Sequence, residues 1–341
     1  EIKRLITAHE PPPEAAGRAR VPAAPVAVVG AGPCGLAAAS FLARARRAVT
    51  VFESREAAGG MVSATIPGYR ASSAAVARDL ERVAAAGVEI RYGREIGADL
   101  GIEDLRAQGF GPIVLAIGAC RGRRLGLAGE DAAGVHDGLD FLRAARRGAP
   151  PALGPRVGVI GGGDVAMDCA RTALRLGAAE VTIYYRRTRT EMPAQAEELM
   201  DLLDEGGRLV ELAAPRGLRS RGGRLERVVM VRTELGPADD SGRPGVREVE
   251  GSEHELELDA LIVAVGQRPD LAVLGGATAA LTPAGYLAVD PETLETSLPG
   301  VYAGGDIAGR GPASIVEAAA GGRRIAEAIL RHAGGLRVVA R

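Results

Sequence analysis

Cysteine is scarce in this chain and never occurs in pairs. Cys34, Cys120 and Cys169 are the three cysteines of 341 residues, and no CxxC motif joins any two of them. This spacing argues against a disulfide framework and against a zinc or iron–sulfur site built by this chain. The four histidines are equally scattered, with no Ser–His–Asp or HExxH grouping. We therefore predict three free cysteines, no metal site, and no side-chain acid, base or nucleophile.

A dominant charge and a long apolar run are also missing. The net charge is −1, so no basic field points to nucleic acid or an anionic membrane as a partner. No apolar run reaches the roughly 18 residues that span a bilayer, and no signal-peptide pattern opens the sequence. Hydrophobic and charged shares of 47% and 25% are typical of globular domains. We predict a soluble, cytoplasmic protein of two domains, and Glu1 in place of Met suggests a fragment or a processed product.

A glycine-rich loop follows the first buried strand. VAVV (residues 26–29) leads into GAGPCG (30–35), a helical pattern over 36–47, and a second strand, VTVFE (49–53). Strand, G-x-G-x-x-G, helix and terminal acid form the dinucleotide fingerprint. Its glycines bring the backbone and a helix N-terminus close to a pyrophosphate, and Glu53 can accept hydrogen bonds from unphosphorylated ribose hydroxyls. The candidate residues are Gly30, Gly32, Pro33, Gly35 and Glu53.

The same unit occurs a second time with the opposite charge at its tip. VGVI (157–160) leads into GGGDVA (161–166), a helix over 167–176, and the strand VTIYYRR (181–187). In place of the acid stand guanidinium groups, whose planar donors suit a phosphate; a solvated basic turn is the alternative. The first unit therefore predicts FAD and the second NADPH, with NADH as an alternative. The candidate residues are Gly161, Gly163, Asp164, Val165, Arg186, Arg187 and Arg189.

Several further motifs, in order, resemble one family. They are FESREAAGGMV, IPGYR, VLAIGA, GGGDVAMDCAR, YRRTRTEMPA, VAVGQRPD and VYAGGDIAGRGPASIVEAAAGGR, and they extend from about residue 22 to 331. The chain resembles the glutamate synthase small (beta) subunit. That family is related to the flavoprotein subunit of a putative selenate reductase and to the NADPH-input half of dihydropyrimidine dehydrogenase.

The resemblance implies further site residues. For FAD they are Gly59, Gly60, Met61, Ile96, Gly118, Gly305, Asp306, Ser314 and Ile315, and for NADPH it adds Gly266. In the family, the Gly-Asp pair holds the ribityl or phosphate end of FAD, and the last helix directs its N-terminus at the flavin ring. The family also has an N-terminal cysteine-rich segment that holds iron–sulfur clusters, and this chain lacks the cysteines for it.

The order of the motifs predicts an α/β architecture of two Rossmann-like domains, the pyridine nucleotide-disulfide oxidoreductase type. An FAD domain (22–119 plus 267–333) is split by an inserted NADPH domain (120–266), which carries a β-meander within 207–259. Helices are expected at about 72–87, 191–205 and 312–333. Residues 1–21 are expected to be a linker or the remnant of an upstream segment, and 334–341 a tail.

Three functions remain open on the sequence. The first is an electron-input flavoprotein, in which NADPH reduces FAD and electrons pass singly to iron–sulfur clusters of an upstream domain or a larger catalytic subunit. The second is a thiol–disulfide reductase, against which the missing cysteine pair counts. The third is a non-catalytic flavin-binding scaffold. The final electron acceptor is not encoded in these motifs.

Overall fold

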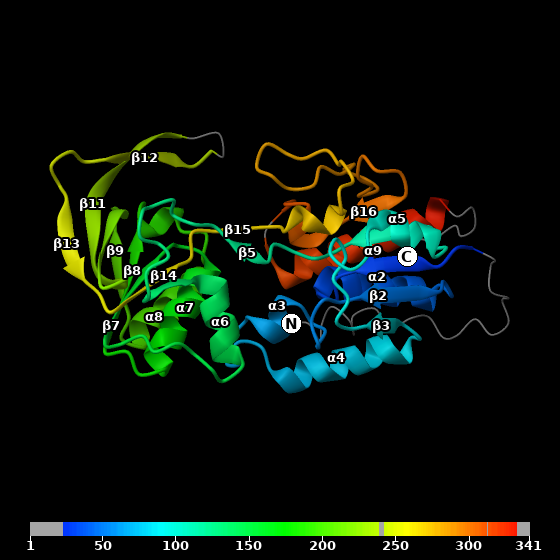
Figure 1. Ribbon diagram of the computed structural model, residues 1–341, viewed down its shortest axis with the longest axis horizontal. Helices are drawn as coiled ribbons and strands as arrows, with labels where there is room; N and C mark the ends of the chain where they lie inside the picture. The colour runs from blue at the N-terminus through cyan, green and yellow to red at the C-terminus, as the bar shows by residue number, and fades with distance from the viewer. Residues whose placement is uncertain (1–22, 239–241, 312, 333–341) are drawn as a thin grey trace. The chain divides into compact units, whose positions relative to one another are not determined.

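The computed structural model describes residues 23–238, 242–311 and 313–332, so the predicted linker and tail lie outside the described part of the chain. The described residues form two compact units, one within 23–64, 68–120 and 268–332, the other within 65–67 and 121–267. The first unit is thus built from an early and a late segment of the chain, blue to cyan and orange to red in Figure 1, and the second from the segment between them. Where the chain passes between them, β5 (Arg121–Gly122) pairs with β15 (Gln267–Arg268).

A five-stranded parallel sheet forms the centre of the first unit, in the order β16-β4-β1-β2-β3. Its strands are β1 (Val26–Val29), β2 (Val49–Phe52), β3 (Glu89–Arg91), β4 (Ile113–Leu115) and β16 (Val301–Ala303). The edge strand β16 follows β4 by about 190 residues in the chain, because the second unit intervenes.

Helices and loops cover both faces of this sheet. The helices are α2 (Pro33–Arg44), α3 (Met61–Ala64), α4 (Ser73–Ala85), α5 (Ile102–Ala107) and α9 (Ile315–His332), with 3₁₀ turns η2 (Leu271–Leu274) and η3 (Gly305–Ile307). Val26 and Val28 pack into one cluster with residues of α2 and α9. Ala27 and Val29 point to the other face, where α5 and η2 contribute. Burial on both faces explains why the strand is apolar without alternation.

The second unit repeats this plan with the sheet order β6-β14-β7-β8-β9, again parallel throughout. Its strands are β6 (Val135–Asp137), β7 (Arg156–Ile160), β8 (Glu180–Tyr185), β9 (Arg208–Glu211) and β14 (Ala260–Val263). Its helices are α6 (Gly138–Arg146), α7 (Asp164–Arg175) and α8 (Ala196–Asp204), with a 3₁₀ turn η1 (Arg189–Glu191). All three α-helices pack on one face of the sheet.

An antiparallel sheet covers the other face of the second sheet. It contains β10 (Ala213–Arg221), β11 (Arg224–Ala238), β12 (Pro244–Glu248) and β13 (His254–Glu257). The predicted meander needs two corrections. β9 joins the parallel sheet, and β13 pairs with β11 instead of β12. The cause is the length of β11, whose first half pairs with β10 and β13 while its second half pairs with β12.

The described helices contain none that is long and apolar enough to cross a membrane. The helices expected from the sequence are present with shorter bounds. α8 begins at Ala196 because residues 189–191 form a separate 3₁₀ turn and Pro193 lies between the two.

Candidate functional site

One edge of the first sheet gathers most of the predicted FAD residues. Gly30 follows β1, Glu53 follows β2, Gly118 lies shortly after β4, and Gly305 lies shortly after β16. Parallel strands end at the same edge of a sheet, so four segments distant in sequence meet there. The carboxyl edge of an open α/β sheet is where such folds bind ligands. The whole predicted FAD set belongs to this unit.

The glycines of the first loop are needed for different physical reasons. A Cβ at Gly30, where φ is +100°, would meet the Ala116 carbonyl oxygen at 2.6 Å, and one at Gly35 would meet the Gly30 carbonyl oxygen at 2.0 Å. The protein itself therefore requires these two glycines. Gly32 differs, because its Cβ would find no atom nearer than 3.9 Å. The free space beside Gly32 is what a pyrophosphate approaching the backbone would need.

Gly32 is also the N-cap of α2 and provides no side chain to cap this helix. The N-terminus of a 12-residue helix thus faces the free space with Pro33 at its first position. Pro33 lacks an N–H and fits the first turn without loss. Unpaired N–H groups and the positive end of the helix dipole favour an anion at this place. The loop geometry fits the phosphates of a dinucleotide.

Glu53 is buried and binds the loop directly. One carboxylate oxygen accepts a hydrogen bond from the Ala31 N–H at 2.8 Å, and the other accepts from the Arg55 N–H at 3.0 Å. The bond from Ala31 joins the end of β2 to the glycine loop after β1, and the bond from Arg55 holds the turn after β2. The oxygen that accepts from Ala31 has a second lone pair for a ribose hydroxyl, whereas the other oxygen also accepts from the Ser54 hydroxyl at 3.5 Å. Glu53 therefore both stabilises the glycine loop and is a candidate to bind the ribose of FAD.

The remaining predicted FAD residues lie in three places. Gly59, Gly60 and Met61 lead into α3, and the Gly59 N–H donates to the Ala31 carbonyl oxygen at 2.7 Å, next to the first loop. Ile96 is buried in a bridge with Leu100, on the face that α5 covers. Ser314 precedes α9, whose first residue is Ile315, and its hydroxyl accepts from the Glu317 N–H at 3.1 Å. The last helix therefore starts at a capped turn.

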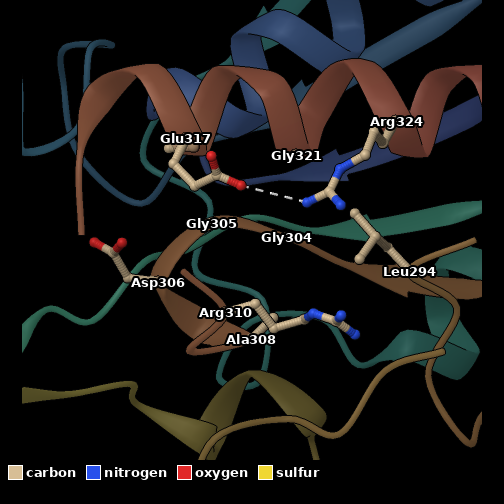
Figure 2. Close-up of a pocket in the computed structure, with 10 residues that line it drawn as sticks. Leu294, Gly304, Gly305, Asp306, Ala308, Arg310, Glu317, Gly321 and Arg324 are labelled. Carbon is tan, nitrogen blue, oxygen red and sulfur yellow. Dashed lines mark ion pairs between the residues drawn. The ribbon is translucent and has the colours of Figure 1, made fainter. Parts of the chain in front are cut away.

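Asp306 lines a pocket beside α9, shown in Figure 2. The pocket is small, with a cavity volume of about 10 Å³, and it opens to solvent. Glu317 and Arg324, both from α9, form an ion pair of 3.5 Å across its rim. Burial raises the pKa of Asp306, so a hydroxyl that donates to its carboxylate would relieve the cost of its charge. Arg310, Glu317 and Arg324 were not predicted as site residues, although the first two lie within VYAGGDIAGRGPASIVEAAAGGR and the third directly follows it.

The carboxyl edge of the second sheet carries a second glycine loop, with arginines in place of the acid. Gly161 follows β7, Arg186 follows β8, and Gly266 lies shortly after β14. A Cβ at Gly161 would meet the Ala264 carbonyl oxygen at 2.3 Å, whereas one at Gly163 would find no atom nearer than 3.7 Å. Gly163 is the N-cap of α7, which continues with Asp164 and Val165. In both loops the first glycine leaves no room for a side chain, and the N-cap glycine of the following helix has free space beside it.

The three arginines after β8 are not equivalent. Arg186 is exposed, and its guanidinium makes no hydrogen bond or ion pair with the described residues. Arg187 is only 4% exposed, and its Nε donates to the Pro244 carbonyl oxygen at 2.7 Å, which ties β8 to the start of β12. Arg189 is ion-paired with Glu211, Nε to Oε1 at 2.6 Å. Arg186 is therefore the arginine best placed to receive a phosphate.

Neither buried cysteine has the properties of a reactive thiol. Burial, aided by the charge of Asp306, raises the pKa of Cys34 to about 12. Burial also raises the pKa of Cys169 well above its ordinary value. Thiolates are the reactive form, so both side chains are inert near neutral pH. All three cysteines are free, and no group of three metal-ligating side chains occurs within the residues the structure describes.

Comparison with known proteins agrees with this geometry. Residues 24–322 match the family described as pyridine nucleotide-disulphide oxidoreductase. The chain is 39% identical to a putative glutamate synthase [NADPH] small chain of Cereibacter sphaeroides, covering 92% of this chain and 78% of that protein. It is 43% identical to the NADP(+)-dependent formate dehydrogenase subunit beta of Moorella thermoacetica, covering 89% of this chain but only 43% of that longer subunit.

Among solved structures, Mycobacterium tuberculosis FprA in complex with NADPH superposes with a TM-score of 0.78 at 20% identity, covering 91% of this chain and 84% of FprA. That likeness supports the fold, and it confirms the predicted α/β class with two dinucleotide-binding domains. The predicted FAD and NADPH cofactors and the oxidoreductase class are confirmed at the level of the family. The chain belongs to the pyridine nucleotide-disulphide oxidoreductase family, as a glutamate synthase small-chain-like oxidoreductase.

Proposed function

We propose that this chain is the electron-input part of a larger oxidoreductase, taking a hydride from NADPH onto FAD and passing electrons singly to iron–sulfur clusters. The clusters would lie on an upstream domain or on a partner, such as a larger catalytic subunit. The observation that carries the proposal is the pair of matching sheet edges with opposite charge at the second strand, Glu53 in one and Arg186 in the other. An acid suits the free ribose of FAD, and a guanidinium suits a 2′-phosphate.

Relatives of the chain support this assignment. The Cereibacter protein is named for NADPH and as a small chain, and the Moorella protein is named for NADP(+) and as a subunit beta. Both names describe one component of an assembly. A chain of this kind can therefore serve different final reactions while keeping the same input chemistry, and the acceptor is set by the partner. A cytoplasmic location remains a prediction.

The protein's contribution to the reaction is binding and orientation. When bound, FAD accepts two electrons as a hydride from NADPH and can release them one at a time. The glycine loops and the N-termini of α2 and α7 would fix the two pyrophosphates. Glu53 and Asp306 would fix the adenosine and ribityl parts of FAD, and Arg186 the adenosine end of NADPH. No side chain needs to transfer a proton for this chemistry.

An anaerobic stopped-flow experiment tests the proposal. The FAD-loaded protein is mixed with NADPH or NADH, and the flavin absorbance near 450 nm is followed before a one-electron acceptor, ferricyanide, or a disulfide, DTNB, is added. We expect rapid bleaching with NADPH, slower bleaching with NADH, and reoxidation by ferricyanide but not by DTNB. A flavin that stays oxidised with both nucleotides would instead support the scaffold function.

The thiol reductase alternative makes a separate prediction. Replacing Cys34, Cys120 and Cys169 by alanine should leave NADPH-dependent ferricyanide reduction within about threefold of the parent, because two of these thiols are buried and protonated. Steady-state rates of the flavin-loaded triple variant provide the measurement. Loss of turnover in a variant that still folds and retains FAD would revive a thiol mechanism.

A further inference from the structure

Glu211 ends β9, the strand next to β8, and the end of β8 carries the arginines predicted to bind NADPH. In the parallel register Glu211 lies opposite Tyr185, the residue before Arg186. Figure 1 shows β9 beside β8 at the outer part of this sheet. The carboxyl ends of β8 and β9 thus bring a carboxylate to the neighbourhood of a site proposed for a phosphate. A bare carboxylate there would repel a 2′-phosphate and could instead accept a hydrogen bond from an unphosphorylated ribose.

Arg189 engages both oxygens of this carboxylate. Its backbone N–H donates to Oε2 of Glu211 at 3.0 Å, and its Nε donates to Oε1 at 2.6 Å. Burial alone would raise the pKa of Glu211, but these bonds from Arg189 outweigh it and lower the pKa below its ordinary value. The carboxylate is therefore ionised near neutral pH, and its charge is compensated by one guanidinium.

The local turn fixes Arg189 in this position. Glu191 accepts hydrogen bonds from the N–H and the hydroxyl of Thr188 at 3.0 and 2.6 Å, which forms a capping box around η1. The Tyr185 hydroxyl donates to the Glu191 carbonyl oxygen at 2.9 Å and anchors the end of the turn to β8. Because the backbone of the turn is held at both ends, the Arg189 N–H points at Glu211 as a consequence of the fold.

We propose that Glu211 is a specificity-determining residue and that Arg189 is a positioning residue that neutralises it. In this arrangement Arg186 attracts the 2′-phosphate, and Arg189 keeps the neighbouring carboxylate from repelling it. The inference rests on the proposed binding of NADPH at this tip. It differs from the simpler interpretation of the sequence, in which Arg189 contacts the phosphate itself. The two assignments predict opposite results when both residues are removed together.

The test compares the FAD-loaded parent with Arg189→Ala, Glu211→Gln and the double variant. Calorimetry measures binding of 2′,5′-ADP and 5′-AMP, which carry the adenosine end of NADPH and of NADH and need no turnover. We expect Arg189→Ala to weaken the binding of 2′,5′-ADP at least about tenfold, because the Glu211 carboxylate is then no longer neutralised and repels the 2′-phosphate. Binding of 5′-AMP should be unchanged or tighter. The KM for NADPH divided by the KM for NADH should rise accordingly.

Rescue decides between the two assignments. If Arg189 acts through Glu211, adding Glu211→Gln to Arg189→Ala should restore 2′,5′-ADP binding to within about threefold of the parent. A double variant that binds as weakly as Arg189→Ala would overturn the inference and place Arg189 on the phosphate. Arg189→Lys, which keeps the charge, should retain most of the preference. A parent that binds both nucleotides equally, and an Arg186→Ala variant that does not differ from it, would contradict the proposed NADPH site itself.

Discussion

Replacing Gly32 with valine should leave a folded protein that no longer retains FAD. Gly32 has extended backbone angles, φ −80° and ψ −179°, which a β-branched residue adopts readily. A Cβ there would find no atom nearer than 3.9 Å, so the chain has room for the first atom of the new side chain. The same space is where the FAD pyrophosphate would approach the loop. Overpacking of about 1–3 kcal/mol against the ligand corresponds to a loss of affinity of roughly five- to 150-fold.

Flavin per chain, FAD titration of the flavin-stripped protein and its thermal unfolding are the measurements. We expect the affinity for FAD to fall by roughly five- to 150-fold, while the apoprotein unfolds within about 1 kcal/mol of the parent. Gly35→Ala is the matched comparison, since its Cβ would lie 2.0 Å from the Gly30 carbonyl oxygen. That variant should lose stability with or without flavin. Full flavin occupancy in Gly32→Val would show that the free space serves something other than the pyrophosphate.

The fold was predictable because its signals are local. Each parallel sheet is built around a buried apolar strand, VAVV or VGVI, which runs directly into its glycine loop and helix. The return of the chain to the first sheet was predictable only from the resemblance. β16 joins β4 across an insertion of about 150 residues, and no periodicity reveals that pairing. The meander was partly mispredicted for the same reason, because strand pairing is a long-range property.

The sequence predicted which loops form the candidate site, but it did not predict the contacts of the individual side chains. Adjacent arginines look interchangeable in sequence, yet both lie in a bend just past the end of β8. This bend leaves Arg186 in solvent and buries Arg187 against the start of β12. Glu211 was missed because its importance comes from the register of β9 with β8. A carboxylate that ends a short strand, as in RLVE, was the available signal.

Arg186→Ala should strongly reduce the preference for NADPH without affecting NADH. A charged hydrogen bond to a phosphate contributes about 1.5–3 kcal/mol, which corresponds to roughly 10- to 150-fold in the KM for NADPH. NADH has no phosphate at that position, so its KM should change by less than about twofold. The limiting kcat should also stay constant, because the contact is remote from the hydride and equal in the ground and transition states.

Arg187→Ala is the internal comparison for this prediction. Its guanidinium is buried and holds the Pro244 carbonyl oxygen, so its loss should lower the unfolding temperature and affect NADPH and NADH alike. Rising salt should erode the NADPH preference of the parent and of Arg187→Ala, but not that of Arg186→Ala, because screening acts on the exposed phosphate contact. Steady-state kinetics with both nucleotides at two ionic strengths measures all of these effects. Equal losses for the two nucleotides in Arg186→Ala, or a parent that prefers NADH, would remove Arg186 from the phosphate site and leave the tip of β8 as a solvated basic turn.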